Sequence, residues 1–455
     1  MPGLLGTLHT AKSGMTVSQT SIQTVTHNLN NLNTPGYSRQ RVEQKEKDAY
    51  SYPGYNSKIG AGQLGTGVEA VDIIRIRNTF YDFQFRNESH TQGKINIKYD
   101  HYTNMEKIFN EPSDTSISAS IANYFSSWQE LSKNPTDVAS RDIVVQNAKY
   151  LADNVSNVKV KLDNLSEQAN EKIKNDINDM NDMFNQIKAL NKEIRIVKGN
   201  GKSPNDLLDQ RDHLLDKLSF KMNLENPEVK DALEQEISKV EIVNTAGKKE
   251  LVIEYGEPTK TKKIPAKEIS GELQGSLDMI EKIKENTDRL IEFSKGIVKG
   301  VNNVLNGKDA NDPITVGAKD LFVLDEKNNP VLTVKKALLE KPRDLDVTTD
   351  TAYNMYHLKD KKLDIGNPVE KMTINKFYNT LIQKMGNESQ EIIRNEKNQS
   401  KIIKEIDNLR SNVSGVSLDE EMVSLIQFQH AYTASAKVIS TVDSLLDVVI
   451  NGLVK

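Results

Sequence analysis

Small and apolar residues recur every three or four positions at the beginning of the chain, in steps that alternate without a break. Such a heptad stripe predicts an amphipathic helix that needs a partner helix. The stripe comprises Leu4, Leu8, Ala11, Met15, Ser18, Ile22, Val25, Leu29 and Leu32. The same segment is rich in Thr, Ser, Asn and Gln, which have weak helix propensity. Its helix therefore depends on packing for its stability.

A second stripe with the same spacing occupies the C-terminal end of the chain. It comprises Leu418, Met422, Leu425, Gln429, Tyr432, Ala436, Ile439, Asp443, Leu446, Ile450 and Leu453. Two stripes of similar length at opposite ends of one chain predict that the terminal helices pair as a coiled coil. The alternative is two ordinary amphipathic helices, each packed on a globular core.

Long helices with two interruptions are predicted for the middle of the chain. An apolar stripe from Leu151 to Val197 predicts a helix that starts at Asp137 and is on the order of 90 Å long, which is typical of a rod. Alternating apolar residues on both sides of Ala246-Gly247 predict a β-hairpin. We therefore expect a mainly α fold with β insertions, built as an elongated rod of long antiparallel helices.

The predicted organisation has four parts. Residues 1–45 with 411–455 form a terminal coiled-coil assembly domain, residues 46–222 with 268–305 and 371–410 form a helical rod core, residues 223–267 form an inserted β-containing side domain, and residues 306–370 form a second small mixed insertion.

The composition excludes several classes of function for this protein. The 455 residues carry a net charge of −4, so there is no basic field for a nucleic-acid partner. The chain has no cysteine, which excludes disulfides, thiolate metal sites and cysteine nucleophiles. No apolar run reaches transmembrane length and no cleavable signal peptide is visible, so we expect no membrane insertion.

Motifs for catalysis or for cofactors are weak. The 7 histidines are scattered and lack the spacing of metal ligands. Gly199-Asn200-Gly201-Lys202-Ser203 superficially resembles a phosphate-binding loop, but Ile196 stands where the first glycine belongs and a helix precedes it. We therefore expect no catalytic residue, no cofactor and no metal.

Four aspartates follow at helical spacing after Ser203-Pro204, which we interpret as a helix start with Ser203 as the N-cap. They are Asp206, Asp209, Asp212 and Asp216. Our main interpretation of this row is a solvated outer helix face. A packing or salt-bridge role and, with the smallest weight, acid–base catalysis are the alternatives.

The segment that closes the first predicted helix has the greatest specificity. It contains Asn28, Asn31, Thr34, Pro35, Gly36 and Tyr37 in the pattern Asn-x-x-Asn-x-x-Thr-Pro-Gly-Tyr. The two asparagine amides can satisfy free carbonyls at a helix end or on a neighbouring subunit, and the Pro-Gly pair then turns the chain. Together with Ser38-Arg39-Gln40, this segment resembles the signature of the axial proteins of the bacterial flagellum, which are the rod, hook and hook-associated proteins.

Other segments agree with this resemblance and refine it. The chain from Ser414 to Ile450 is similar to the last helix of that family. Asn205 to Asp212 and Ile269 to Gly275 resemble segments of the first hook-associated proteins, the FlgK family, whereas hook and rod proteins have β-rich middles. The resemblance is strong at both ends of the chain and negligible in the two insertions.

The resemblance implies a structural role and no enzymatic activity. It implies head-to-tail assembly of copies into a helical homo-oligomer that joins the flagellar hook to the filament, so the partners would be further copies, the hook protein and the third hook-associated protein. It also implies export through the flagellar type III apparatus without a cleaved signal peptide, to an extracellular place in the flagellum. A cytoplasmic export chaperone would hold the C-terminal stripe before secretion.

Three alternatives to this function stay open. The chain could be an exported scaffold with an enzymatic middle domain, such as a peptidase or a wall hydrolase. It could be a hook or rod protein, or a coiled-coil adhesin or scaffold unrelated to flagella.

Overall fold

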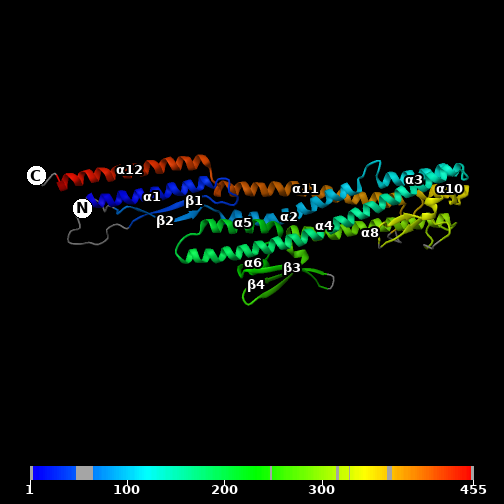
Figure 1. Ribbon diagram of the computed structural model, residues 1–455, viewed down its shortest axis with the longest axis horizontal. Coiled ribbons are helices and arrows are strands. Elements are labelled where there is room, and N and C mark those ends of the chain that lie inside the picture. The colour runs from blue at the N-terminus through cyan, green and yellow to red at the C-terminus, as the bar shows by residue number, and fades with distance from the viewer. Residues whose placement is uncertain are drawn as a thin grey trace.

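The computed structural model describes residues 4–47, 65–245, 248–313, 317–326, 328–365 and 371–451. These residues form an elongated molecule in which long helices run along one axis (Figure 1). The first helix begins and the last helix ends at the same end of the molecule (Figure 1). The expected mainly α rod with small β insertions is therefore confirmed.

The long helices of the described residues are α1 (Leu4–Asn30), α2 (Thr79–Phe109), α4 (Val138–Gly199), α8 (Gly271–Leu305), α11 (Ile374–Ser414) and α12 (Leu418–Asn451). Shorter helices connect them: α3 (Ile117–Lys133), α5 (Asn205–Lys221), α6 (Pro227–Glu234), α7 (Ala266–Ile269), α9 (Lys336–Glu340), α10 (Thr349–His357) and the 3-10 turns η1 (Pro342–Asp344) and η2 (Leu358–Asp360). The strands are β1 (Gln40–Glu46), β2 (Val68–Arg75), β3 (Ile237–Thr245), β4 (Lys248–Tyr255), β5 (Lys260–Pro265), β6 (Phe322–Leu324) and β7 (Leu332–Val334).

The terminal helices α1 and α12 run antiparallel and pack along each other, which confirms their predicted pairing (Figure 1). The antiparallel strands β1 and β2 pack on α1 as well, so α1 lies between the strand pair and α12. The two terminal helices approach closely, since a Cβ atom added to Gly14 would lie 3.2 Å from Oγ of Ser435.

Helices α2, α4, α8 and α11 form the rod, which continues along the long axis from the base of the terminal pair (Figure 1). Helix α2 packs between α11 and α8, and α8 packs on α4. The predicted helix start at Asp137 is observed, because this side chain accepts hydrogen bonds from the backbone N–H groups of Ala139 and Ser140 and caps α4. The helix spans 62 residues, close to the predicted length.

Two small units containing strands lie on the rod. The antiparallel sheet β3–β4–β5 packs on α4, where the Asn181 side chain exchanges two hydrogen bonds with the backbone of Val240. The Ala246-Gly247 turn of the predicted hairpin lies outside the described residues. The pair β6–β7 lies at the far end of the rod, where Phe322 packs against Tyr124 in a core around the buried Trp128.

The predicted start of α5 needs correction. This helix begins at Asn205, with Pro204 in the N-cap position and no side-chain cap. The Ser203 hydroxyl donates to Asp72 of β2 instead, at 2.5 Å. A side chain that bonds to a neighbouring strand is not free to cap its own helix.

Candidate assembly site

We call the segment from Asn28 to Tyr37 the asparagine motif. It lies at the base of the terminal helix pair, where α1 ends and α12 begins, and Asn28 is at its centre. This side chain is 1 % exposed and uses its whole hydrogen-bonding capacity. Its Nδ2 atom donates to the Gln40 carbonyl and to Oε2 of Glu421, both at 2.9 Å. Its Oδ1 atom accepts from the Gln40 N–H at 2.9 Å and from the Tyr37 hydroxyl at 2.7 Å. One amide therefore joins α1, β1 and α12.

Asn31 and Tyr37 have different roles beside this centre. The Asn31 side chain donates to the His27 carbonyl at 3.0 Å, a carbonyl near the end of α1 that also accepts from the Asn31 backbone N–H at 3.2 Å. Burial raises the pKa of Tyr37 above its ordinary value, and the neighbouring acidic charges raise it further. Tyr37 therefore stays a neutral donor toward Asn28.

Gly36 shapes the turn that brings Tyr37 back to α1. Its φ of +81° lies in the left-handed region, and a Cβ atom there would lie 2.8 Å from Cβ of His213 on α5. Glycine suits both the backbone conformation and the close approach of α5. The Pro35-Gly36 turn thus lies directly against the rod.

We expect Gly36→Ala to destabilise this turn by at least about 1–2 kcal/mol, because alanine is strained in the left-handed region and would also contact His213. Hydrogen exchange of the Gln40 amide, which is bonded to Asn28, should accelerate accordingly. Gly386→Ala in α11 is the matched control, since nothing lies within 4 Å of its added Cβ. Unchanged exchange at Gln40 would contradict the role of Gly36.

Arg39 attaches the start of α12 to the end of α11. Its backbone N–H donates to the Ser414 carbonyl at 2.8 Å. Its guanidinium lies 2.6 Å from Glu421 and 2.7 Å from Glu420. Glu421 is 1 % exposed, and its carboxylate is paired with the charge of Arg39 and accepts a hydrogen bond from Asn28. This arrangement fixes the base of α12 against β1 and the end of α11.

The aspartate row of α5 is buried, so its interpretation as a solvated face was wrong. Only Asp206 is exposed, whereas Asp209, Asp212 and Asp216 each lose more than nine-tenths of their accessible surface. Asp209 accepts from the Ser38 N–H at 2.9 Å and from the Ser38 hydroxyl at 2.7 Å. The row therefore anchors the asparagine motif to the rod.

Arginines from three other elements neutralise the buried aspartates. Arg75 of β2 lies 2.7 Å from Asp209 and 2.9 Å from Asp212. Arg86 of α2 and Arg410 of α11 contact Asp216 at 2.7 Å and 2.6 Å.

Burial alone would raise the pKa of Asp212, but the charges of Arg77 and Arg86 and a hydrogen bond from Arg75 lower it below its ordinary value. Asp212 is therefore ionised at neutral pH. The charged cluster links β2, α2, α5 and α11 at the base of the terminal pair.

The structure places the predicted stripe residues of α1 mostly at half-buried positions. Ser18 and Val25 are buried, and Leu4, Leu8, Ala11, Met15, Ile22, Leu29 and Leu32 are half-buried. The remaining buried residues, Val17, Ser21, Thr24 and Asn28, lie one position away from the predicted stripe.

The predicted stripe of α12 is less covered. Leu425, Ala436, Ile439 and Leu446 are half-buried, Leu418, Met422, Tyr432 and Ile450 are exposed, and Leu453 lies outside the described residues. The buried residues of α12 are Glu421 and Val442, each one position before a member of the predicted stripe. The face toward α1 is thus rotated from the prediction, because a polar pair at Glu421 fixes the orientation of the helix.

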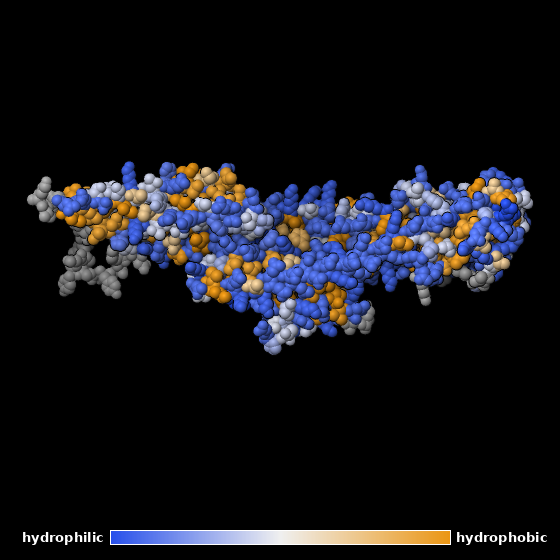
Figure 2. Space-filling model, in the orientation of Figure 1, coloured by the Kyte–Doolittle hydropathy of each residue, from blue (hydrophilic) through white to orange (hydrophobic). Residues whose placement is uncertain are grey.

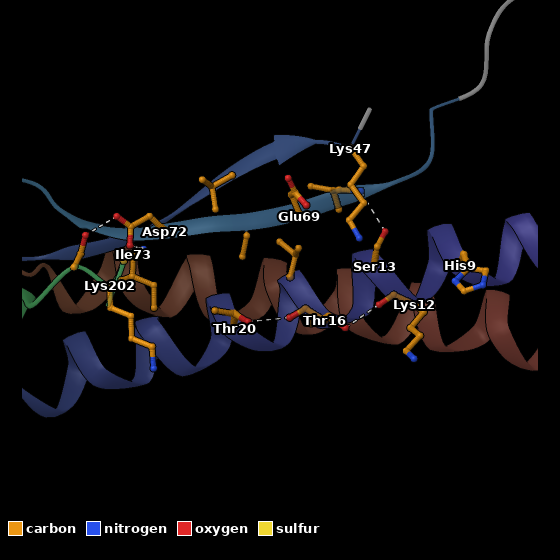
Figure 3. A pocket seen from close by; sticks show the side chains of 16 residues that line it. His9, Lys12, Ser13, Thr16, Thr20, Lys47, Glu69, Asp72, Ile73 and Lys202 are labelled. Carbon is orange, nitrogen blue, oxygen red and sulfur yellow. Dashed lines mark hydrogen bonds between the residues drawn. The ribbon is translucent and has the colours of Figure 1, made fainter. Parts of the chain in front are cut away.

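A groove runs between α1, β2 and the turn at Gly201 (Figure 3). The Ser13 hydroxyl, on its α1 wall, accepts from the Val68 N–H at 3.2 Å and so holds β2 against α1. Lys12 and Lys202 line it together with Asp72, so its walls carry both positive and negative charges.

Among the described residues, no group of His, Asp or Glu side chains could hold a metal ion. Within the same residues, no helix has the length and apolarity needed to cross a membrane.

Comparison with known families defines the class of this protein. Residues 408–452 match the family model described as "Flagellar basal body rod FlgEFG protein C-terminal", which places the chain among the flagellar axial proteins. Residues 102–322 match the model described as "Flagellar hook-associated protein FlgK helical domain". The chain belongs to the FlgK family of flagellar hook-associated proteins and is a structural component of the bacterial flagellum.

Individual relatives are similar over nearly their full length. "Flagellar hook-associated protein 1" of Bacillus subtilis is 28% identical, with 98% of each chain covered. The protein of the same name from Salmonella typhimurium is 24% identical, over 97% of this chain and 98% of the relative. The solved structure of the flagellar hook junction protein FlgK from Burkholderia pseudomallei shares 20% identity, with a TM-score of 0.38 over 53% of this chain and 46% of that chain.

Sequence reasoning missed several residues of the site. Arg39 is part of the quoted motif, but its place in the sequence indicates no role, and nothing in the sequence singles out Glu421. The arginines of the charged cluster were not singled out at all. Their signal was present in Arg75, Arg77 and Arg86, which cluster within a short segment that ends one strand and begins a helix.

Proposed function

We propose that copies of this protein assemble head to tail into a tubular segment that joins the flagellar hook to the filament. The observation that supports this proposal is the uncovered apolar surface of α12 (Figure 2). Its exposed large apolar residues are Leu418, Met422, Val423, Ile426, Tyr432, Val438, Leu445, Val448, Val449 and Ile450. An apolar surface of this length is typical of a protein interface.

The candidate assembly site would fix the orientation of α12, and with it the orientation of this apolar surface. Arg39, Asn28 and Glu421 fix the base of α12, and the charged cluster fixes the same base to the rod. We therefore treat residues 1–45 with 411–455 as a terminal assembly domain carried by the rod. Contacts between different surfaces of successive copies do not close on themselves and so produce a helical assembly.

The remaining partners follow from the family. The hook protein and the third hook-associated protein would lie at the two ends of the tubular segment. A cytoplasmic export chaperone would cover the apolar surface of α12 before export, because a helix with one apolar face suits a helix-in-groove contact. Export would use the flagellar type III apparatus without a cleaved signal peptide.

Replacing exposed apolar residues of α12 tests the assembly proposal. Ile426→Ser with Val448→Ser should leave the monomer folded, because these side chains are 49% and 63% exposed. The double variant should lose polymerisation, measured by light scattering and electron microscopy. In cells it should leave hooks without filaments.

Lys437→Ala with Ser444→Ala is the matched control, since both side chains are exposed on the same helix. This control should assemble normally. Normal polymers and normal motility in the Ile426/Val448 variant would refute the role of α12.

A further inference from the structure

The exposed face of α11 carries a row of four cations. Arg394, Lys397, Lys401 and Lys404 follow steps of three, four and three residues, which places them on one side of the helix. All four are exposed, and within the part of the chain that the structure describes none of them has an ion pair. Ile393 and Ile402, which are the sequence neighbours of Arg394 and Lys401, are exposed as well. We call these four residues the basic row.

Helix α8 carries a row of the opposite sign and nearly the same length. Glu281, Glu285, Asp288 and Glu292 follow steps of four, three and four residues on the side of α8 that faces away from its core residues. Glu285 is bonded to Lys282 and Lys384, and no ion pair involves the other three among the described residues. We call these four residues the acidic row.

The two rows cannot meet within one chain. Ion pairs of 2.8 Å join Lys282 to Glu388 and Glu285 to Lys384, and they fix the register of α8 against α11. In this register the centre of the acidic row lies beside residue 384 of α11, whereas the basic row is centred near residue 399. At about 1.5 Å per residue the two centres are roughly 22 Å apart along the rod.

We propose that the basic row of one copy binds the acidic row of a neighbouring copy that is shifted by roughly 22 Å along the rod axis. This inference rests on the proposed self-assembly and adds a lateral contact between rods. The occupant is a second copy because the two rows carry four charges each, of opposite sign, over nearly equal lengths of helix. The contact joins different surfaces, so it repeats from copy to copy without closing. Since α8 and α11 run antiparallel, Lys397 comes to lie near Asp288 of the neighbour.

Charge reversal and its rescue test this contact with the full-length chain. Lys397→Glu with Lys401→Glu should raise the critical concentration for polymerisation at least tenfold at low salt, and so should Glu281→Lys with Asp288→Lys. A chain with all four substitutions should return to within about threefold of the native value. The differences should shrink in concentrated salt, because salt screens exposed charges. Lys192→Glu with Lys198→Glu, two exposed lysines of α4 without an ion pair in the described residues, is the control of equal charge change.

A cross-link gives a second measurement. The chain has no cysteine, so Lys397→Cys in one copy and Asp288→Cys in another introduce unique thiols. A short bis-maleimide should join them in polymers and not in dilute monomer. Image reconstruction should show lateral neighbours displaced by the predicted distance.

The possible outcomes separate this inference from the proposed function. If the native chain forms no ordered polymer, self-assembly and this contact are both refuted. If the native chain polymerises but the reversals have no effect, or the fourfold variant does not recover, only the contact between the two rows is refuted. If polymerisation is lost on changing the basic row but not on changing the acidic row, the proposed contact is refuted and the basic row binds a different anionic partner.

Discussion

Asp209→Ala should lower the free energy of local unfolding around α5 by about 3–5 kcal/mol, because it removes one of the two carboxylates that hold Arg75 and leaves the buried cluster with one arginine charge in excess. Asp209 accepts two hydrogen bonds from Ser38 and forms an ion pair with Arg75. The variant therefore breaks the attachment of the asparagine motif to the rod. It also leaves the Ser38 N–H without an acceptor in a buried position, which adds to the cost.

Native-state hydrogen exchange is the suitable measurement, because a chain of this length with separate cores does not unfold in a single two-state step. Amides of β1 and α5 should exchange faster by the factor that corresponds to this loss. Gln210→Ala on the same helix is the control and should change the free energy by less than about 0.5 kcal/mol, since Gln210 is exposed. A loss below about 1 kcal/mol for Asp209→Ala would show that water replaces this carboxylate.

Glu421→Ala should release the base of α12 at a cost of about 3 kcal/mol. Glu421 is buried and binds both Arg39 and Asn28, so its removal leaves an amide N–H and part of a guanidinium without a partner. The amides of the first turns of α12 should exchange faster, while those of α4 should be unchanged. Polymerisation should weaken as well, because the orientation of α12 relative to the rod would no longer be fixed.

The neighbouring glutamate provides a matched control. Glu420 also contacts Arg39, at 2.7 Å, but its side chain is 64% exposed. Exposed ion pairs contribute less than about 1 kcal/mol, so Glu420→Ala should have a small effect. Equal effects of the two alanine variants would contradict the assignment of Glu421 as the residue that orients α12.

The parts of the fold that could be predicted are those that follow from the pattern of apolar residues along single helices. The long helix α4 follows from a continuous apolar stripe and from the capping Asp137. The pairing of α1 with α12 follows from two stripes that match in spacing and length. Both predictions use only the period of the helix and the need to bury one of its faces.

The face of α12 that meets α1 could not be predicted, because this helix is apolar on more than one side. The stripe that starts at Leu418 and the observed face that starts at Glu421 have the same spacing. The choice between them depends on Arg39 and Asn28, which are distant in the sequence. Glu421 directly follows Asp419 and Glu420, so its sequence neighbours give no sign that it is the one that will be buried.

The aspartates of α5 were misinterpreted for a similar reason. A row of carboxylates on a helix is usually solvated, and the arginines that bury this one come from β2, α2 and α11. Arg410 is 194 residues away from Asp216, with which it pairs. Only the three-dimensional arrangement brings these charges together.

The long separation of these contacts has a consequence for the order of folding. Asn28 meets Glu421 across 393 residues, and Tyr102 meets Glu388 across 286 residues. Helices α1 and α2 thus complete their packing only with α12 and α11, in the last part of the chain. Such distant contacts slow folding, although the entropy of closing a loop grows only slowly with its length. A chain delivered through a narrow channel from either end could therefore not complete these two helix pairs until its last segment had arrived.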